Sequence, residues 1–267
     1  MANLEIRVGV IGAGVMGEAL IAGLITYGVK PSLISIHEKR KERSDELVSR
    51  YKVSASDLGE VCKADVLLLV TKPQDMQALL GEIKGKLGIK TLIVSFAAGK
   101  KIGFISENTG GSNPVIRVMP NTPTLVGKGA AAISLGAGVS ADQSDFIKGL
   151  LAATGKVIEV SEDLQDAVTA TSGSGPAYFF AFVEAMIAGA KKLGLSEADA
   201  TTLTVQTIVG SAALLAESGD SATTLREKVT SPNGTTAAAL ASFESAHLSH
   251  IVADAMAAAH KRSQELA

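Results

Sequence analysis

The sequence contains no tryptophan, and aromatic residues make up only 4% of its 267 residues. The interior must therefore be built mainly from Ala, Val, Ile and Leu, within a hydrophobic fraction of 46%. A chain of this length can form one large domain or two modest ones, each with its own core.

Cysteine, surplus charge and long apolar runs are also scarce. The single cysteine, Cys62, can form no intrachain disulfide, which favours a reducing compartment. A net charge of −2 argues against nucleic acid or an anionic membrane as a partner, because both favour a basic face. No apolar run approaches the ~20 residues of a membrane helix, and the start, MANLEIRVGV, lacks a signal-peptide pattern. We expect a soluble, cytoplasmic protein.

The first half of the sequence alternates short β-branched runs with helical stretches, which is typical of βαβ units. The runs occupy residues 6–12, 33–38, 66–71, 91–99, 115–120, 130–136 and 156–160. Nearly continuous apolar runs such as VLLLV indicate strands that are covered on both faces. The pattern predicts an α/β fold, a Rossmann-type doubly wound parallel sheet, over residues 1–161.

The second half shows no strand pattern after Asp163, and alanine with other good helix formers dominates it. Breaks at 172–176, 192–196, 217–221 and 230–234 divide it into about five helices. Such an all-α domain, residues 162–267, has more apolar surface than it can hide alone. We therefore expect the helices to form a homodimer, or a higher oligomer.

A glycine-rich segment, GAGVMG at residues 12–17, directly follows a predicted strand and precedes a predicted helix. In this context the spacing is typical of a dinucleotide-binding turn. Gly12 allows the tight turn, Gly14 lets the backbone approach a pyrophosphate, and Gly17 lets helix and strand pack closely. The expected cofactor-binding residues of this turn are Ile11, Gly12, Ala13, Gly14, Val15, Met16 and Gly17.

Charged residues after the second predicted strand leave the choice of dinucleotide open. Glu38 lies about 20 residues past the motif, where an acid would bind the ribose diol of NAD. Lys39 and Arg40 beside it would instead hold the 2′-phosphate of NADP. The charges that follow, at residues 41–43, are better explained as a solvated helix start.

Two further segments, VTKPQ at 70–74 and SFAAG at 95–99, each close a predicted strand. Open α/β sheets bind ligands beyond the carboxyl ends of their strands. We therefore expect the cofactor cleft to include Thr71, Lys72, Pro73, Ala97, Ala98 and Gly99. Pro73 and Gly99 also have plain structural explanations, because proline and glycine commonly end strands and form loops.

Six segments, taken together and in order, resemble the pyrroline-5-carboxylate reductase family. They are IGAGVMG, TKPQ, SFAAG, RVMPNTP (117–123), EDLQDAVTATSGSGPAYFF (162–180) and LREKVTSPNGTT (225–236). That family reduces Δ1-pyrroline-5-carboxylate to L-proline, the last step of proline biosynthesis, using NADPH or less often NADH. Its fold is a Rossmann domain followed by a helical domain that intertwines with its partner in a dimer. The resemblance runs from the first strand to the final helix and implies the same reaction here.

The resemblance also implies a substrate loop in the segment TSPNGTT, residues 230–236. Ser231, Gly234, Thr235 and Thr236 would receive the substrate carboxylate, and Thr236 would lie beside the imine nitrogen as the catalytic hydroxyl. The residues agree with this role, because a loop before a helix start binds anions and a hydroxyl can hydrogen-bond a nitrogen that gains a proton. The alternative is an ordinary turn between two helices, capped by a threonine.

Further roles are carried over residue by residue. Glu162 and Asn121 are expected at the substrate site, and Asp57 and Lys228 near the cofactor. A solvated acid at a helix start is the alternative for Glu162. No metal is expected, since His247 and His250 have no evident third ligand.

The sequence departs from the family pattern in two places. Asn233 replaces the first glycine of a loop that usually reads Ser-Pro-Gly-Gly, and asparagine tolerates left-handed backbone angles better than most residues. His37 and Glu38 stand where the family often has Asn-Arg, and Arg40 is a candidate substitute for that arginine.

Three rival functions follow from the same residues. A β-hydroxyacid dehydrogenase requires a lysine with an asparagine about one helical turn later, but residues 195 and 196 after the Lys191–Lys192 pair are Leu and Ser. A non-catalytic dinucleotide sensor would have no use for the hydroxyl of Thr236. A reductase of the six-membered homologue stays open, because one methylene changes specificity by only roughly 1–3 kcal/mol.

Overall fold

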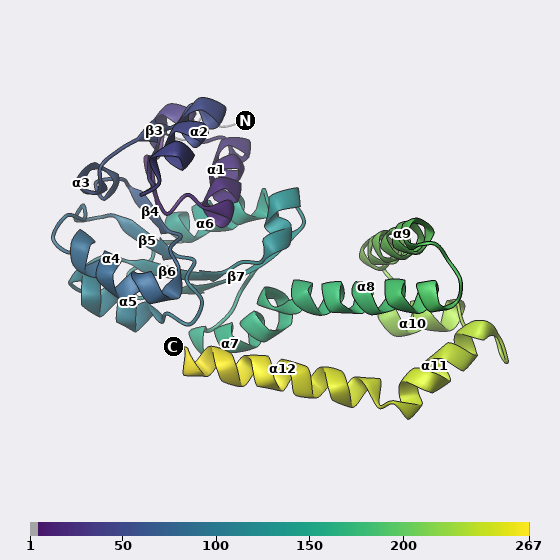
Figure 1. Cartoon of the computed structure of the whole chain (residues 1–267). Coiled ribbons are helices and arrows are strands. Elements are labelled where there is room, and N and C mark those ends of the chain that lie inside the picture. Colours follow the sequence, from purple (N-terminus) through teal and green to yellow (C-terminus); the bar gives the residue numbers. More distant parts are fainter. Residues whose placement is uncertain (1–4, 267) are drawn as a thin grey trace. The chain divides into compact units, whose positions relative to one another are not determined.

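The structure is a computed structural model that describes residues 5–266 (Figure 1). Its packing divides the chain into two compact units. The first unit extends to Ser174 and also includes the end of the chain from Ala259, and the second unit is Gly175–Ala258. The predicted division at 161/162 lies just after the last strand, which ends at Glu159. The first compact unit continues beyond it, through the short helices that follow this strand.

Within the described residues, the first unit contains one eight-stranded sheet in the order β3-β2-β1-β4-β5-β6-β7-β8. The strands are β1 (Val8–Ile11), β2 (Ile34–His37), β3 (Ser54–Ala55), β4 (Val66–Leu69), β5 (Leu92–Ser95), β6 (Val115–Met119), β7 (Gly129–Leu135) and β8 (Gly155–Glu159). All neighbouring strands except β6 and β7 are parallel, and Val10, for example, lies beside Ile36 on one side and Leu68 on the other. The predicted Rossmann-type sheet is confirmed.

One strand pair departs from the expected parallel arrangement. β6 and β7 are antiparallel, with Val118 opposite Ile133. The connection between them, residues 120–128, contains only the short 3₁₀ helix η3 (Thr122–Val126). A parallel crossover needs a dozen or more residues, so this connection is too short to return the chain to the same end of the sheet.

Helices cover both faces of the sheet, as doubly wound folds require. They are α1 (Val15–Tyr27), η1 (Pro31–Leu33), α2 (Lys41–Tyr51), α3 (Leu58–Val61), η2 (Pro73–Asp75), α4 (Met76–Ile83), α5 (Ile102–Thr109), α6 (Ala141–Ala152), η4 (Glu162–Leu164), α7 (Gln165–Val168) and the π-helical turn η5 (Thr169–Gly173).

Successive residues of the same strand enter two different cores. Leu68 of β4 packs in one core with Leu20 of α1 and Leu150 of α6. Its neighbour Leu67 packs in the other with Leu80 of α4. Burial on both faces explains why VLLLV is apolar throughout instead of alternating with polar residues.

The second unit contains helices only, within the described residues. They are α8 (Gly175–Lys192), α9 (Glu197–Glu217), α10 (Ala222–Lys228), α11 (Thr235–Ser245) and α12 (Leu248–Glu265), whose end belongs to the first unit. The four predicted breaks occur, and two of the helices after them begin with serine caps: Ser196 accepts the backbone N–H of Asp199, and Ser221 that of Thr224. A further break precedes α12, where His247 has a φ of 54°.

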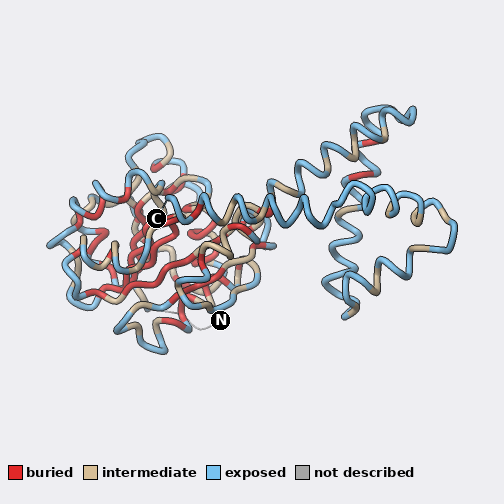
Figure 2. The backbone as a smooth tube through the Cα atoms, turned by 90° about the horizontal axis from the view of Figure 1, so that it is seen from below, coloured by how far each residue is buried: buried red, intermediate tan, exposed pale blue. Residues whose placement is uncertain are grey.

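The helices of the second unit bury few of their apolar side chains. Buried residues, drawn red, gather in the sheet unit, whereas the helices of the second unit are mostly pale blue (Figure 2). Large apolar side chains that remain exposed in this unit include Phe179, Phe180, Leu193, Leu203, Val209, Leu214 and Ile251. An apolar surface of this extent marks an interaction face.

Candidate dinucleotide and substrate sites

The glycine-rich turn between β1 and α1 has the backbone geometry of a phosphate cradle. Gly12 has a φ of 88°, and a side chain there would lie 2.6 Å from the carbonyl oxygen of Val70. At Gly17 a side chain would collide with the carbonyl oxygen of Gly12. Gly14, in contrast, faces open space within 4 Å and begins α1 without a side-chain cap. The first N–H groups of α1 are therefore available to an anion.

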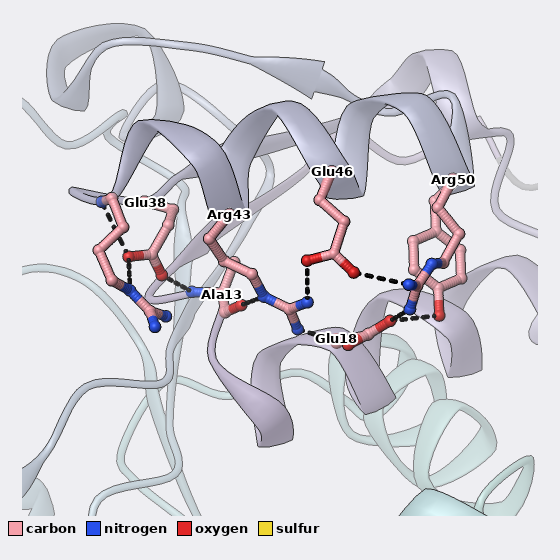
Figure 3. Close-up of polar contacts among 8 residues, drawn as sticks. Ala13, Glu18, Glu38, Arg43, Glu46 and Arg50 are labelled. Carbon is pink, nitrogen blue, oxygen red and sulfur yellow. Dashed lines mark hydrogen bonds and ion pairs between the residues drawn. The ribbon is translucent and has the colours of Figure 1, made fainter.

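Glu38, at the end of β2, is tied to this turn. Its Oε2 accepts the backbone N–H of Ala13 at 3.0 Å, and its Oε1 accepts the backbone N–H and the Nε of Arg40 at 3.1 and 2.9 Å (Figure 3). Burial alone would raise the pKa of Glu38, but the hydrogen bonds from Arg40 and Ala13 outweigh it, so this pKa lies below its usual range. Glu38 is ionised at neutral pH.

A second charged network holds α2 against the turn (Figure 3). Arg43 donates its Nε to the carbonyl oxygen of Ala13 at 3.1 Å and pairs with Glu18 and with Glu46. Arg50 also pairs with both acids. Burial raises the pKa of Glu18, and hydrogen bonds from Arg43, Tyr51 and Arg50 lower it further than burial raises it. The residues predicted as a solvated helix start thus include Arg43, which instead braces the turn.

A cavity of about 710 Å³ opens beside the glycine turn, at the carboxyl ends of β1, β2 and β4. Predicted cofactor residues in its lining are Ile11, Gly12, Gly14, Glu38, Lys39, Arg40, Thr71 and Lys72. Its other lining residues, which sequence reasoning missed, are His37, Val70, Gln74, Asp75, Ala78, Leu79 and Glu82. Several of these come from α4, which carries no recognisable motif, so only the fold brings them to the cavity.

A smaller cavity of about 280 Å³ adjoins the first and shares Val70, Thr71 and Lys72 with it. Its lining also includes Met16, Phe96, Gly173 and residues 119–122 of the segment RVMPNTP. The π-helical turn η5 brings Gly173 to this cavity, where a side chain would strike the methyl group of Met119. The two cavities therefore meet at the residues that follow β4.

Several predicted cofactor residues lie outside the linings of these two cavities. Pro73 begins the turn η2, and Asp57 caps α3 by accepting the backbone N–H of Glu60. Val15 is exposed beside Gly14, and the loop of Ala97, Ala98 and Gly99 lines neither cavity. A side chain at Gly99 would instead lie 2.9 Å from the carbonyl oxygen of Leu266, near the end of the chain.

Two residues predicted at the substrate site hold backbone elements together. Asn121 donates its amide to the carbonyl oxygen of Ser172 at 3.1 Å and accepts the backbone N–H of Ala130 at 2.8 Å. Glu162 accepts the backbone N–H of Ile102 at 2.7 Å, which caps α5. Both side chains therefore join separate backbone segments, whether or not they also contact the substrate.

Glu162 also belongs to a buried charged cluster around Arg117. The Arg117 side chain is 3% exposed and lies 3.4 Å from Glu162 and 4.0 Å from Asp166. Asp166 in turn accepts the hydroxyl of Ser263 at 2.6 Å. The motif EDLQD thus supplies two carboxylates to an arginine that sequence reasoning did not single out.

The segment TSPNGTT lies in the second unit and forms a tight turn that leads into α11. The backbone N–H of Gly234 donates to the carbonyl oxygen of Ser231 at 3.1 Å, with Pro232 and Asn233 between them. Asn233 has a φ of 58°, the left-handed conformation that asparagine was expected to tolerate. Gly234 begins α11 without a side-chain cap, so the threonine cap considered from the sequence is absent here.

The first backbone N–H groups of α11 have no hydrogen-bond acceptor within the described residues. The N–H groups of the first turn of α11, from Thr235 onward, have no helical acceptor. The Thr236 hydroxyl also has no hydrogen-bond partner within the described residues. Lys228 lies in the same unit and pairs with Asp220 at 2.5 Å.

Among the described residues, no three His, Cys, Asp or Glu side chains come together as a metal site. No helix in the described part of the chain is both long and apolar enough to cross a membrane.

The fold and the glycine-rich turn are those of a dinucleotide-binding protein. A family model described as NADP oxidoreductase coenzyme F420-dependent matches residues 7–99, and one described as pyrroline-5-carboxylate reductase dimerisation matches residues 162–266. The curated pyrroline-5-carboxylate reductase of Corynebacterium melassecola is 40% identical, over 97% of this chain and 98% of its own. The chain belongs to the pyrroline-5-carboxylate reductase family.

Solved structures agree with this assignment. A pyrroline-5-carboxylate reductase from Coxiella burnetii matches with a TM-score of 0.93 and 34% identity, over 99% of both chains. The Plasmodium falciparum pyrroline carboxylate reductase with NADP bound matches with a TM-score of 0.87 and 30% identity, over 98% of both chains. The family resemblance noted from the sequence is confirmed, and the β-hydroxyacid dehydrogenase alternative is set aside.

Proposed function

We propose that this chain reduces Δ1-pyrroline-5-carboxylate to L-proline with NADPH as the reductant, the last step of proline biosynthesis. The observation that carries the proposal is the start of α11, where unpaired N–H groups and an unpartnered threonine hydroxyl meet in a chain of this family. A carboxylate and an adjacent imine nitrogen are the ligands that such a pair of features would take.

The first unit would hold the coenzyme. Gly14 and the first turn of α1 would take the pyrophosphate, Glu38 and Arg40 the adenosine ribose, and residues 119–122 the nicotinamide end. The fit is supported by the open space at Gly14 and by the two adjoining cavities. When bound, NADPH supplies the hydride that reduces the carbon of the C=N bond.

The substrate would be held by Ser231, Gly234, Thr235 and Thr236. Backbone N–H groups at the start of α11 would receive its carboxylate, which fixes the ring in one orientation. The ring nitrogen would react in its protonated form, so that hydride addition to the carbon completes the reduction, and the Thr236 hydroxyl would accept a hydrogen bond from that N–H. Glu162 and Asn121 remain proposed substrate-binding residues, and Ala97–Gly99, Asp57 and Lys228 remain proposed coenzyme-binding residues.

The helical part, residues 162–267, would act as the substrate-binding and dimerisation domain, joining two copies of the chain or more. The dimerisation model that matches this part and the exposed apolar helices support self-association. A cytoplasmic location also fits, since Cys62 is a free, buried thiol.

The test measures initial rates with Δ1-pyrroline-5-carboxylate and each of NADPH and NADH, following coenzyme absorbance. Thr236→Val removes the hydroxyl at nearly constant shape and should lower kcat by about 100-fold or more, whereas Thr236→Ser should retain most activity. Thr26→Val, the same change at an exposed position near the end of α1, is the matched control and should match the wild type.

Two results would contradict the proposal. Equal rates for Thr236→Val and the wild type would remove Thr236 from the mechanism. Coenzyme binding without turnover would refute the reductase assignment and favour a sensor, or, if the six-membered imine were reduced instead, a different substrate.

A further inference from the structure

Three buried polar side chains lie side by side across the middle of the sheet. Ser95 of β5 pairs with Arg117 of β6, and Arg117 pairs with Ser134 of β7. The three residues are 0%, 3% and 1% exposed, and directly paired residues point to the same face of a sheet. Polar groups buried in this way have specific partners. This polar row therefore marks where other elements are joined to the sheet by polar contacts.

The partners of Arg117 in the polar row connect it to the end of α12. Arg117 pairs with Glu162 and Asp166, which belong to the short helices after β8. Asp166 accepts the hydroxyl of Ser263 at 2.6 Å. Ser263 is 4% exposed and lies in the part of α12 that belongs to the first unit. The end of the last helix is thus attached to the polar row through one carboxylate.

The polar row also borders the loop expected to contact the coenzyme, residues 97–99, which lies between β5 and α5. At the start of this loop, Ser95 accepts the backbone N–H of Ala97 at 3.3 Å. Shortly after the loop, Ile102 begins α5 and donates its backbone N–H to Glu162 at 2.7 Å. The loop is therefore held on both sides, by a member of the polar row and by a partner of the row.

The middle of the same loop lies against the end of the chain. Gly99 has a φ of 73°, and a side chain at this position would lie 2.9 Å from the carbonyl oxygen of Leu266, directly after α12. Phe96, directly before the loop, lines the smaller cavity. The residues that follow α12 thus border a segment that leads out of the proposed coenzyme site.

We propose that Ser263 is a positioning residue for the coenzyme. Its hydrogen bond satisfies the Asp166 carboxylate, which would otherwise compete with Glu162 for Arg117. Glu162 in turn holds the start of α5, and with it the loop of residues 97–99. Without the hydroxyl, Asp166 would keep only a cation 4.0 Å away in a mostly buried site, which favours a shift of Arg117 toward it. The inference rests on the proposed coenzyme site and adds to it a residue far along the chain from the glycine-rich turn.

The test measures NADPH binding by the full-length protein, followed by the fluorescence of the coenzyme, and needs no turnover. Ser263→Ala removes the hydroxyl that Asp166 accepts. Ser140→Ala is the matched control, because it also removes a hydrogen-bonded hydroxyl, at the start of α6, from a position outside the linings of both cavities. Asp166→Ala and the double variant establish whether Ser263 acts through Asp166. Melting temperatures establish that each variant is folded.

Ser263→Ala should raise the Kd for NADPH by about three- to tenfold, whereas Ser140→Ala should stay within about twofold of the wild type. In the Asp166→Ala background, Ser263→Ala should change this Kd by less than about twofold. The inference would be overturned by an unchanged Kd in Ser263→Ala, by an equal rise in Ser140→Ala, or by an undiminished effect of Ser263→Ala in the absence of the Asp166 carboxylate.

Kinetics separate this inference from the proposed reaction. For Ser263→Ala the KM for NADPH should rise as the Kd does, with kcat at saturating NADPH within about twofold of the wild type, because the loop would hold the coenzyme equally in the ground and transition states. A lower kcat with an unchanged KM would overturn the positioning role. A weakened affinity in Ser263→Ala, found in a protein without reductase activity, would uphold the inference while refuting the proposed reaction.

Discussion

Arg117→Met removes a positive charge from a buried cluster and leaves Glu162 and Asp166 without their cation. The Arg117 side chain is 3% exposed and that of Asp166 13%, so solvent can replace the lost cation only in part. Removing one partner of a buried ion pair costs about 3–5 kcal/mol. The distances of 3.4 and 4.0 Å and the 30% exposure of Glu162 favour the lower end, about 3 kcal/mol.

The assay is urea unfolding at fixed protein concentration, because self-association makes apparent stability depend on concentration. A loss of about 3 kcal/mol would also lower the melting temperature by roughly 6–12 °C. Arg7→Met is the matched control, since Arg7 pairs with Asp65 at 2.8 Å while both side chains are about half exposed. It should cost less than about 1 kcal/mol. Equal losses for Arg7→Met and Arg117→Met would refute the reasoning.

Three further predictions concern the turns and the coenzyme acid. Gly12→Ala should abolish coenzyme binding and lower the free energy of unfolding by at least about 2 kcal/mol, because it combines a φ of 88° with a contact to Val70. Asn233→Ala should destabilise by about 1 kcal/mol and raise the KM for substrate, whereas Asn233→Gly should leave both unchanged. Glu38 has a lowered pKa in the folded state, so its stabilising effect is present above its unfolded pKa of about 4.3 and is lost as the pH falls through the folded pKa.

Each of these has a measurement that decides it. Coenzyme titration followed by fluorescence tests Gly12→Ala, and retained affinity would contradict the expected clash. Steady-state kinetics and thermal unfolding test the Asn233 variants, and equal behaviour of both would contradict the backbone argument. Unfolding of the wild type and of Glu38→Gln at pH 7 and at pH 3 tests the predicted pH dependence of the stabilisation by Glu38. A stability difference that does not shrink at pH 3 would contradict it.

Local pattern predicted most of the fold because the strands are apolar and the turns contain Gly, Pro or Ser. It missed β3, whose two residues are exposed and carry no apolar signal. It also missed the break at His247, where neither Gly nor Pro marks the turn. It did not predict that β7 runs antiparallel to β6. That direction depends on the length of the connection between the two strands, which hydrophobic periodicity does not report.

The features of the candidate site also fall into those that could be predicted from the sequence and those that could not. The glycine turn and the left-handed Asn233 were readable, because their backbone requirements act within a few residues. The roles of Asn121 and Glu162 in joining distant backbone segments were not, since their partners at Ser172 and Ile102 lie 51 and 60 residues away. Neither the burial of Arg117 nor its carboxylates could be inferred without the packing.

The apolar faces of the second unit have a genetic consequence. Phe179 and Leu203 are exposed in the single chain, and in the proposed dimer each copy would cover such side chains of the other. A substitution that disrupts these helices in one copy would then weaken an unaltered copy paired with it. In a cell that expresses both versions, much of the normal product would be trapped in mixed pairs, so the defective allele would behave as dominant.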